Sequence, residues 1–187
     1  MGRWQPDARG RLAKAALELY AERGFEQVTV AEIADRAGLT ARTFFRQFAD
    51  KREVLFAGSE SLTVLLTDAV GQAPPGESPL AVIADALQQV AEIIGQDRPF
   101  STLRQSVINA NPDLQERERT KLASWSVVLG EGLRGRGVGE PTASLTAETG
   151  VAVFKVAFEQ WLSGSEHATL PDTLEAAFTQ LRAVAAG

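Results

Sequence analysis

Residues 29–48 read TVAEIADRAGLTARTFFRQF, and this stretch decides the fold. Thr29 and Glu32 have the spacing of a capping box, which predicts that a helix begins directly after Thr29. Gly38 is expected to end that helix, because glycine can turn the chain sharply without a Cβ clash. Thr40 is a good N-cap for a second short helix over residues 41–48. The pattern therefore predicts a helix-turn-helix.

The second short helix is predicted to have a buried face and a DNA-facing side. Phe44 and Phe48 lie four residues apart and indicate the buried face. We expect Arg42 to contact guanine through two hydrogen bonds, and the methyl groups of Ala41 and Thr43 to contact thymine methyls. Side chains at helix starts are expected to contact phosphate. The expected DNA-binding residues are Thr29, Thr40, Ala41, Arg42, Thr43, Phe45, Arg46 and Lys51. Helix pairs joined by a glycine turn also occur in proteins that bind no DNA, so the spacing alone leaves a plain αα-corner open.

Hydrophobic spacing predicts helices along nearly the whole chain, and no sustained alternation indicates a strand. We expect an all-α protein of about nine helices, with one continuous helix over about 50–72. The other expected helices cover about 7–23, 29–37, 41–48, 79–95, 100–110, 112–133, 143–163 and 172–185. This organisation predicts a three-helix DNA-binding domain at residues 1–50 and a second helical domain at residues 51–187.

The composition excludes several classes of chemistry. The chain has 187 residues, a formal net charge of −5, one histidine (His167) and no cysteine. Disulfides, thiolate nucleophiles and cysteine-based zinc sites are therefore impossible, and a multi-histidine metal site is excluded. The sequence contains no phosphate-binding loop, dinucleotide-binding glycine motif or HExxH motif. We therefore expect no enzymatic activity, no cofactor and no bound metal.

Charge is distributed unevenly along the chain. Residues 1–55 carry a net charge of +2, whereas residues 56–187 carry −7. An acidic body repels DNA unless a local basic face overcomes it, and residues 40–52 supply such a face. On charge alone, however, an ordinary solvated surface is the favoured interpretation of these residues. The opening residues MGRWQPDARGRL contain no apolar signal segment, and no run of 18 apolar residues indicates a membrane span. We therefore expect a cytoplasmic protein without a membrane partner.

The stretch from Leu12 to Leu55, LAKAALELYAERGFEQVTVAEIADRAGLTARTFFRQFADKREVL, resembles the DNA-binding domain of the tetracycline-repressor (TetR) family of bacterial regulators. Two departures stand out: Phe45 replaces the usual tyrosine, whose hydroxyl donates to a phosphate, and Val28 replaces a frequent threonine. The resemblance implies that Phe45 packs against sugar and backbone. The opening residues RWQP also resemble the N-terminal arm of some actinobacterial members. The matching positions are Gly24-Phe25, Thr29, Ile33, Ala34, Ala37-Gly38, Thr43, Phe44, Phe45, Phe48 and Lys51.

The resemblance further implies a homodimer whose second domain binds a small molecule. Apolar residues on helices 143–163 and 172–185 support a four-helix dimer interface, although the same faces can simply fill the monomer core. Bulky side chains can likewise surround a pocket or form ordinary core, with Arg104 as a candidate polar anchor. The expected interface residues are Val153, Val156, Trp161, Leu174, Phe178 and Leu181. The expected pocket residues are Leu65, Leu103, Arg104, Val107, Trp125, Leu129, Phe154 and Phe158.

These expectations combine into a DNA-binding transcriptional regulator. Its partners are expected to be an inverted-repeat operator in double-stranded DNA, an unidentified small-molecule effector and a second copy of the chain. We expect a repressor that the effector releases from DNA. Two alternatives stay open at this stage: a helical protein-interaction or dimerisation module that binds no DNA, and an activator without ligand control.

Overall fold

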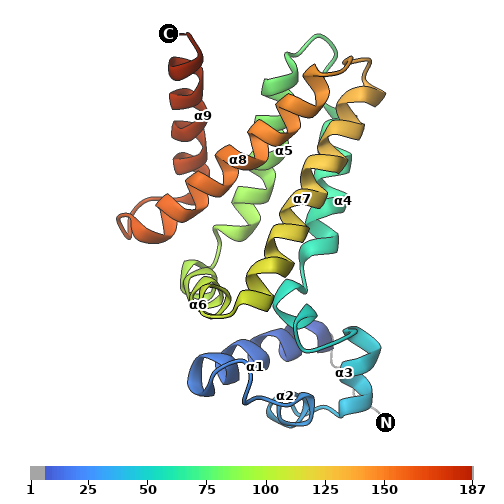
Figure 1. The fold of residues 1–187 in the computed structure, drawn as a ribbon, viewed down its shortest axis with the longest axis vertical. Coiled ribbons are helices and arrows are strands. Elements are labelled where there is room, and N and C mark those ends of the chain that lie inside the picture. Colours follow the sequence, from blue (N-terminus) through green and yellow to red (C-terminus); the bar gives the residue numbers. More distant parts are fainter. Residues whose placement is uncertain (1–6, 187) are drawn as a thin grey trace. The chain divides into compact units, whose positions relative to one another are not determined.

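The computed structural model describes residues 7–186, and all of them lie in helices or in the connections between helices (Figure 1). This confirms the predicted all-α class with nine α-helices in the described part of the chain. The resemblance assigned to RWQP falls outside the described residues. The α-helices are α1 (Ala8–Arg23), α2 (Val30–Arg36), α3 (Ala41–Gln47), α4 (Ser59–Gln72), α5 (Pro79–Ile94), α6 (Arg98–Asn109), α7 (Pro112–Gly135), α8 (Thr142–Ser163) and α9 (Leu170–Ala186).

The helices form two compact units. The first unit contains residues 7–59 and 102–118, and the second contains residues 60–101 and 119–186. The division falls inside both α6 and α7, so each of these helices contributes residues to both units. Residues from the middle of the chain thereby complete the first unit, whereas the sequence predicts one boundary near residue 50.

Capping side chains set the helix ends where the sequence predicts them. Thr29 and Glu32 form the complete capping box of α2, and the Thr40 side chain accepts from the backbone N–H of Thr43 at the start of α3. Ser78 caps α5, whose first residue is Pro79. These side chains satisfy backbone groups that have no partner within the helix.

The predicted continuous helix over 50–72 is wrong, because the chain forms two shorter pieces. A 3₁₀ turn covers Glu53–Phe56, and α4 begins at Ser59. Val54, Leu55 and Phe56 are all buried, although they are consecutive. The carbonyl of Ala57 accepts a hydrogen bond from Arg9 Nε at 2.8 Å. A side chain from α1 thus binds the backbone between the 3₁₀ turn and α4.

Glu53–Gln72 is also the segment whose length and mean hydropathy of 1.3 would allow it to cross a membrane. In the structure its α-helical part is α4 alone, with 14 residues. At about 1.5 Å per residue, α4 is about 21 Å long, which is shorter than a hydrocarbon layer of about 30 Å. Buried Leu66 and Val70 on α4 belong to the core of the second unit.

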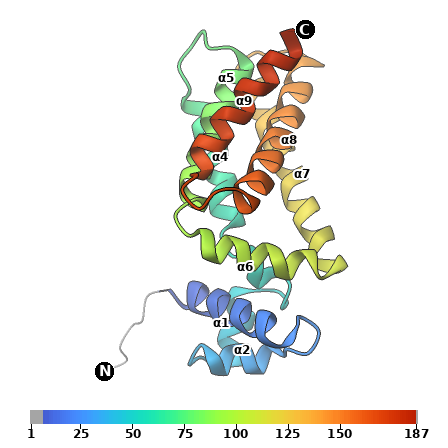
Figure 2. The same ribbon diagram turned by 90° about the vertical axis from the view of Figure 1, so that its left-hand side faces the viewer.

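The second unit packs α5, α8 and α9 against one another (Figures 1 and 2). Gly150 on α8 lies so close to α5 that a Cβ atom added there would be 2.3 Å from Ile83 Cγ2. A Cβ on Gly132 of α7 would similarly lie 2.7 Å from Val70 Cγ1. Glycine at these two positions allows the helices to approach closely.

Two arginines complete the ends of helices in this unit. Arg98 donates to the carbonyls of Trp161, Leu162, Gly164 and Ser165 at the end of α8. Arg136 donates to the carbonyls of residues 70, 73 and 74 at the end of α4. A guanidinium suits this role because it offers several donors and a positive charge to the negative end of a helix.

The contact at Gly150 generates a stability prediction. Gly150→Ala places its new methyl group against the fully buried Ile83 side chain. We expect the free energy of unfolding to fall by about 1–3 kcal/mol, because the core must shift to make room. Gly71→Ala is the control, since nothing lies within 4 Å of a Cβ there. Denaturant unfolding should show no loss in the control, and equal stability of the two variants would contradict the packing described here.

Candidate nucleic-acid interface

The helix α3 is anchored by two aromatic side chains and one arginine. Phe44 and Phe48 are buried, with ring centroids 5.5 Å apart. Arg9 of α1 donates from Nη1 to the carbonyl of Gln47 at 2.7 Å and lies 4.6 Å from the centroid of the Phe48 ring. The buried face predicted from the sequence is therefore confirmed, and an arginine from α1 fixes the C-terminal end of α3.

The turn between α2 and α3 is held by the backbone and by Arg11. Gly38 has a φ of 64°, a left-handed conformation that glycine adopts without strain. The backbone N–H of Leu39 donates to the carbonyl of Ala34 at 2.8 Å, and Arg11 Nη2 donates to the carbonyl of Ala37. These bonds set the direction in which α3 leaves the turn.

The start of α2 is occupied by a carboxylate of its own. Both the backbone N–H and the hydroxyl of Thr29 donate to Glu32 Oε2, at 2.8 and 2.7 Å. The Thr29 bonds, together with Arg23 at 2.7 Å, lower the pKa of Glu32 to about 2. Both donors of Thr29 are thus bound to the Glu32 carboxylate, and a phosphate at the start of α2 would have to compete with this negative side chain for them.

The other side of α3 is open to solvent. Thr40, Ala41, Arg42, Phe45 and Arg46 are exposed, Thr43 is half-buried, and the Phe45 side chain is 60% exposed. The short helix α3 and its N-cap Thr40 therefore gather six of the eight side chains expected to contact DNA. The sequence predicts this set because Phe44 and Phe48, four residues apart, mark the buried face of the helix and leave the other side chains on the exposed face.

Arg42 and Arg46 are the positive charges of this surface. Neither makes an ion pair within residues 7–186. Other arginines of the first unit lie beside carboxylates: Arg23 pairs with Glu32, Arg36 with Glu18 and Glu22, and Arg52 with Asp113. The positive charge of α3 is therefore available to an anionic partner, whereas that of the paired arginines is locally neutralised.

Lys51, the eighth expected DNA contact, has its ammonium group engaged elsewhere. Lys51 Nζ lies 3.0, 3.4 and 3.3 Å from the carbonyl oxygens of Phe25, Glu26 and Val28, and 4.4 Å from the centroid of the Phe25 ring. An ammonium has three donors, so these carbonyls use them all. The geometry gives Lys51 the role of holding the α1–α2 connection, which the sequence could not indicate because the carbonyls lie 23–26 residues away.

Tyr20 links Lys51 to α1. Its hydroxyl donates to the Lys51 carbonyl at 2.7 Å, and its ring meets Phe25 edge-on at 5.1 Å. Burial, with a smaller contribution from Asp50, raises the pKa of Tyr20 well above its usual range. The hydroxyl therefore stays a donor at physiological pH and fixes the chain just beyond α3.

Charged side chains join the 102–118 segment to the rest of the first unit. Arg104 donates from Nε to the carbonyl of Leu55 at 2.9 Å and from Nη1 to Glu118 at 3.0 Å. Arg117 pairs with Glu53 and Asp50. Arg104, the candidate polar anchor for a ligand, uses Nε and Nη1 in these contacts within the first unit. No local sequence pattern indicated these pairs, because their partners are far apart in the chain.

The remaining expected pocket residues are divided between the units. Leu103 and Val107 lie in the first unit with Arg104, whereas Leu65, Trp125, Leu129, Phe154 and Phe158 lie in the second. Trp125, Leu129 and Phe154 are buried, and Leu65 and Phe158 pack against the same core from its margin. Sequence spacing could identify these side chains as core but could not assign them to one unit.

The expected interface residues are mainly part of the monomer core. Val153, Trp161, Leu174 and Phe178 are buried within one chain, Leu181 is half-buried, and Val156 is 59% exposed. The four buried side chains have little surface left for a partner. The sequence had left this alternative open, because an apolar helix face looks the same whether its own chain or a second copy covers it.

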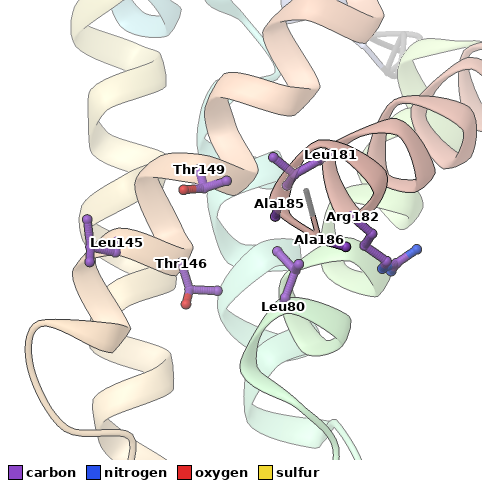
Figure 3. A pocket seen from close by; sticks show the side chains of 8 residues that line it. All are labelled: Leu80, Leu145, Thr146, Thr149, Leu181, Arg182, Ala185 and Ala186. Atoms are coloured by element: carbon purple, nitrogen blue, oxygen red, sulfur yellow. The ribbon is translucent and has the colours of Figure 1, made fainter.

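A hollow of about 590 Å³ lies between α8, α9 and the start of α5 (Figure 3). Helices α8 and α9 meet at their connecting loop and separate towards this hollow (Figure 1). Of the residues expected at an interface, Leu181 lines it, and none of the expected pocket residues does. The lining residues are Leu80, Leu145, Thr146, Thr149, Leu181, Arg182, Ala185 and Ala186.

The contacts of Lys51 lead to a prediction that separates two roles. Lys51→Met keeps the apolar stem and removes the donors to residues 25, 26 and 28. We expect the free energy of unfolding to fall by about 1–3 kcal/mol, as for hydrogen bonds from a charged group. DNA affinity should fall with it, while the dependence of affinity on salt concentration stays unchanged. Unchanged stability together with a salt slope reduced by about one would instead show a phosphate contact.

Comparisons with known proteins agree with this geometry. Residues 12–57 match the family model of bacterial regulatory proteins of the tetR family. Residues 77–186 match the model of the MftR C-terminal domain, which covers more than half of the chain. The first match contains the whole of α2, the turn and α3.

Individual relatives are similar over different lengths. The regulator MftR of Mycobacterium tuberculosis is 29% identical over 185 residues, covering 95% of this chain and 91% of that protein. The transcriptional regulator TcmR of Streptomyces glaucescens is 31% identical over 112 residues, covering 57% of this chain and 50% of that protein. The match to TcmR therefore spans half the length of that relative.

A solved structure supports the fold. FadR of Thermus thermophilus, a TetR-family transcriptional repressor in complex with lauroyl-CoA, aligns over 92% of each chain with a TM-score of 0.59 and 24% identity. Proteins of this family bind operator DNA and small-molecule ligands, typically as dimers. The relatives are transcriptional regulators, which are not enzymes. The chain belongs to the tetR family of bacterial transcriptional regulators and carries a C-terminal domain of the MftR type.

Proposed function

We propose that this regulator is a homodimeric, cytoplasmic repressor that reads an inverted-repeat operator through α3 and is released by a small molecule bound in the second unit. One observation carries the proposal for DNA. Arg42 and Arg46 are exposed on α3 and make no ion pair within residues 7–186, while Phe44 and Phe48 hold the opposite face of the helix. A recognition helix needs one face packed against its own domain and an opposite face whose positive charges are available to DNA.

Each exposed side chain of α3 has a proposed role. Arg42, in the first turn, makes two hydrogen bonds to guanine, the most frequent specific contact of arginine in the major groove. Ala41 and the Thr43 methyl contact thymine methyls. Thr40 and Arg46 bind phosphates and fix the register. Phe45 has no hydroxyl to donate and packs its exposed ring against sugar and backbone.

The dimer follows from the symmetry of operators. Two copies of α3 must lie about 34 Å apart to enter successive major grooves on one side of the DNA. We place the dimer contact on the exposed apolar side chains of α8 and α9, of which Leu145 lines the hollow in Figure 3. Val156, Leu145 and Val184 are 59, 63 and 70% exposed. A second copy would remove this apolar surface from water.

Release by a ligand requires two arrangements of the dimer with different distances between the α3 helices. A ligand shifts this balance only by the difference between its affinities for the two arrangements. FadR of Thermus thermophilus, a repressor of the same fold with bound lauroyl-CoA, supports the proposal that a ligand controls this protein. We assign the ligand to the second unit, which contains Leu65, Trp125, Leu129, Phe154 and Phe158.

Selection of fragments from a random DNA pool by the purified protein tests the DNA proposal. We expect enrichment of an inverted repeat with half-sites about one helical turn apart. Arg42→Ala should then cost about 1–3 kcal/mol at one base position and relax specificity there. Arg36→Ala is the matched control, because Arg36 is an exposed arginine paired with Glu22 on the neighbouring α1. Equal loss of affinity on every sequence would contradict the assignment of Arg42 as a base reader.

Oligomeric state tests the dimer contact. Val156→Glu introduces a charge on α8, and we expect it to shift the protein towards monomer in sedimentation experiments. Val127→Glu is the control, since Val127 on α7 is 57% exposed and lies outside the proposed contact. A dimer that survives Val156→Glu and dissociates with Val127→Glu would move the contact from α8 and α9 to α7.

A further inference from the structure

Two buried polar atoms in the second unit have no hydrogen-bond partner. They are Trp125 Nε1 and Ser126 Oγ, on adjacent residues of α7, and both side chains are 5% exposed. The other indole described in the structure behaves as expected of a buried one: Trp161 Nε1 donates to the carbonyl of Ala168 at 3.1 Å. Buried donors are almost always satisfied, so an orphaned indole N–H requires an explanation.

The surroundings of Trp125 are aromatic. Phe154 of α8 meets the indole edge-on at 5.4 Å, and the rings of Phe154 and Phe158 are stacked with an interplanar angle of 10° and a centroid distance of 6.2 Å. Phe154 is buried, while Phe158 is half-buried at the margin of the core. The Phe158 ring also lies 5.8 Å from the Trp161 ring, centroid to centroid. Flat faces of this kind favour a flat apolar molecule.

The charge of the core restricts the ligand. Among the described residues, the buried polar side chains are Ser101 and Ser126, and no charged side chain is buried. A charged group taken into this core would lose its hydration without gaining a counter-ion, which is costly. An indole N–H is a donor only, so its partner must carry an acceptor.

We propose that Trp125, Phe154 and Phe158 form an effector site selective for an uncharged, flat, apolar molecule with a carbonyl-type acceptor, which receives the hydrogen bond of Trp125 Nε1. This inference rests on the proposed ligand control and assigns to it a chemical class and a specificity-determining residue. The two phenylalanines supply the stacking surface. The absence of buried charge in the described core discriminates against acids and amines.

Matched probes test the site. Fluorenone and fluorene have nearly the same shape, but only fluorenone has a carbonyl acceptor, and fluorenone-4-carboxylate adds a charge. In ¹⁵N–¹H spectra of the full-length protein, fluorenone should shift the indole resonance of Trp125 more than that of Trp161, whose N–H already donates to the carbonyl of Ala168 and whose ring lies 5.8 Å from Phe158. Titration should show fluorenone bound about three- to tenfold more tightly than fluorene, as one net hydrogen bond provides. The carboxylate should bind more weakly than either neutral probe.

Trp125→Phe keeps the aromatic ring and removes the donor. We expect it to bind both neutral probes with equal affinity, whereas Trp161→Phe should keep the preference for fluorenone. If Trp125→Phe does not fold, the wild-type spectrum still shows whether fluorenone shifts the Trp125 resonance. Trp4→Phe and Trp161→Phe identify that resonance by elimination. Equal binding of both probes by the wild type, a preference retained in Trp125→Phe, or tighter binding of the carboxylate would each overturn the proposal.

Operator binding, measured on the same samples, separates this inference from the proposed function. A protein that binds its operator but none of the probes would overturn the effector site and leave the DNA-binding proposal standing. A protein that binds fluorenone through Trp125 but enriches no operator would overturn the proposed function and leave the ligand site standing.

Discussion

The last carbonyl groups of a helix have no partner within that helix, and they form the negative end of its dipole. In this protein, cationic side chains from distant parts of the chain repeatedly occupy those ends. Arg9 and Arg11 of α1 bind the last carbonyls of α3 and α2. Lys51 binds carbonyls of the α1–α2 connection, which are not helix ends, in a similar way. Arg98 and Arg136 bind carbonyls at the ends of α8 and α4. Each such contact fixes the end of one helix relative to another, which apolar packing alone does only loosely.

This arrangement has a consequence for DNA binding. The first unit uses most of its positive charge internally, in helix ends and ion pairs, so that its surface is less basic than its composition suggests. Arg42 and Arg46 keep their charge free because the back of α3 is held by Phe44, Phe48 and Arg9. Positioning and recognition are therefore performed by different side chains. A regulator with a net charge of −5 can in this way present a small cationic surface at one defined place.

Residues 102–118 are the part of the first unit that lies farthest along the chain. They belong to the first unit, yet they lie on helices α6 and α7, whose other residues belong to the second unit. Arg104, Glu118 and Arg117 join this segment to the residues that follow α3. Helix α7 is continuous and carries both Glu118 of the first unit and Trp125 of the second.

The local sequence determined the helices, their caps, the helix-turn-helix and the exposed face of α3, because each depends on residues within a few positions of one another. Thr29 with Glu32, Gly38, and Phe44 with Phe48 are such pairs and turns. The tertiary structure alone decided the roles of three side chains whose partners come from other elements. Lys51 binds backbone carbonyls, Arg104 binds the carboxylate of Glu118, and Trp161 packs in the buried core. The tertiary structure also divided the predicted 50–72 helix into a 3₁₀ turn and α4, with Arg9 bound to the carbonyl of Ala57 between them. Side-chain type and periodicity indicate that a group will be buried or charged, but only the fold decides which group satisfies it.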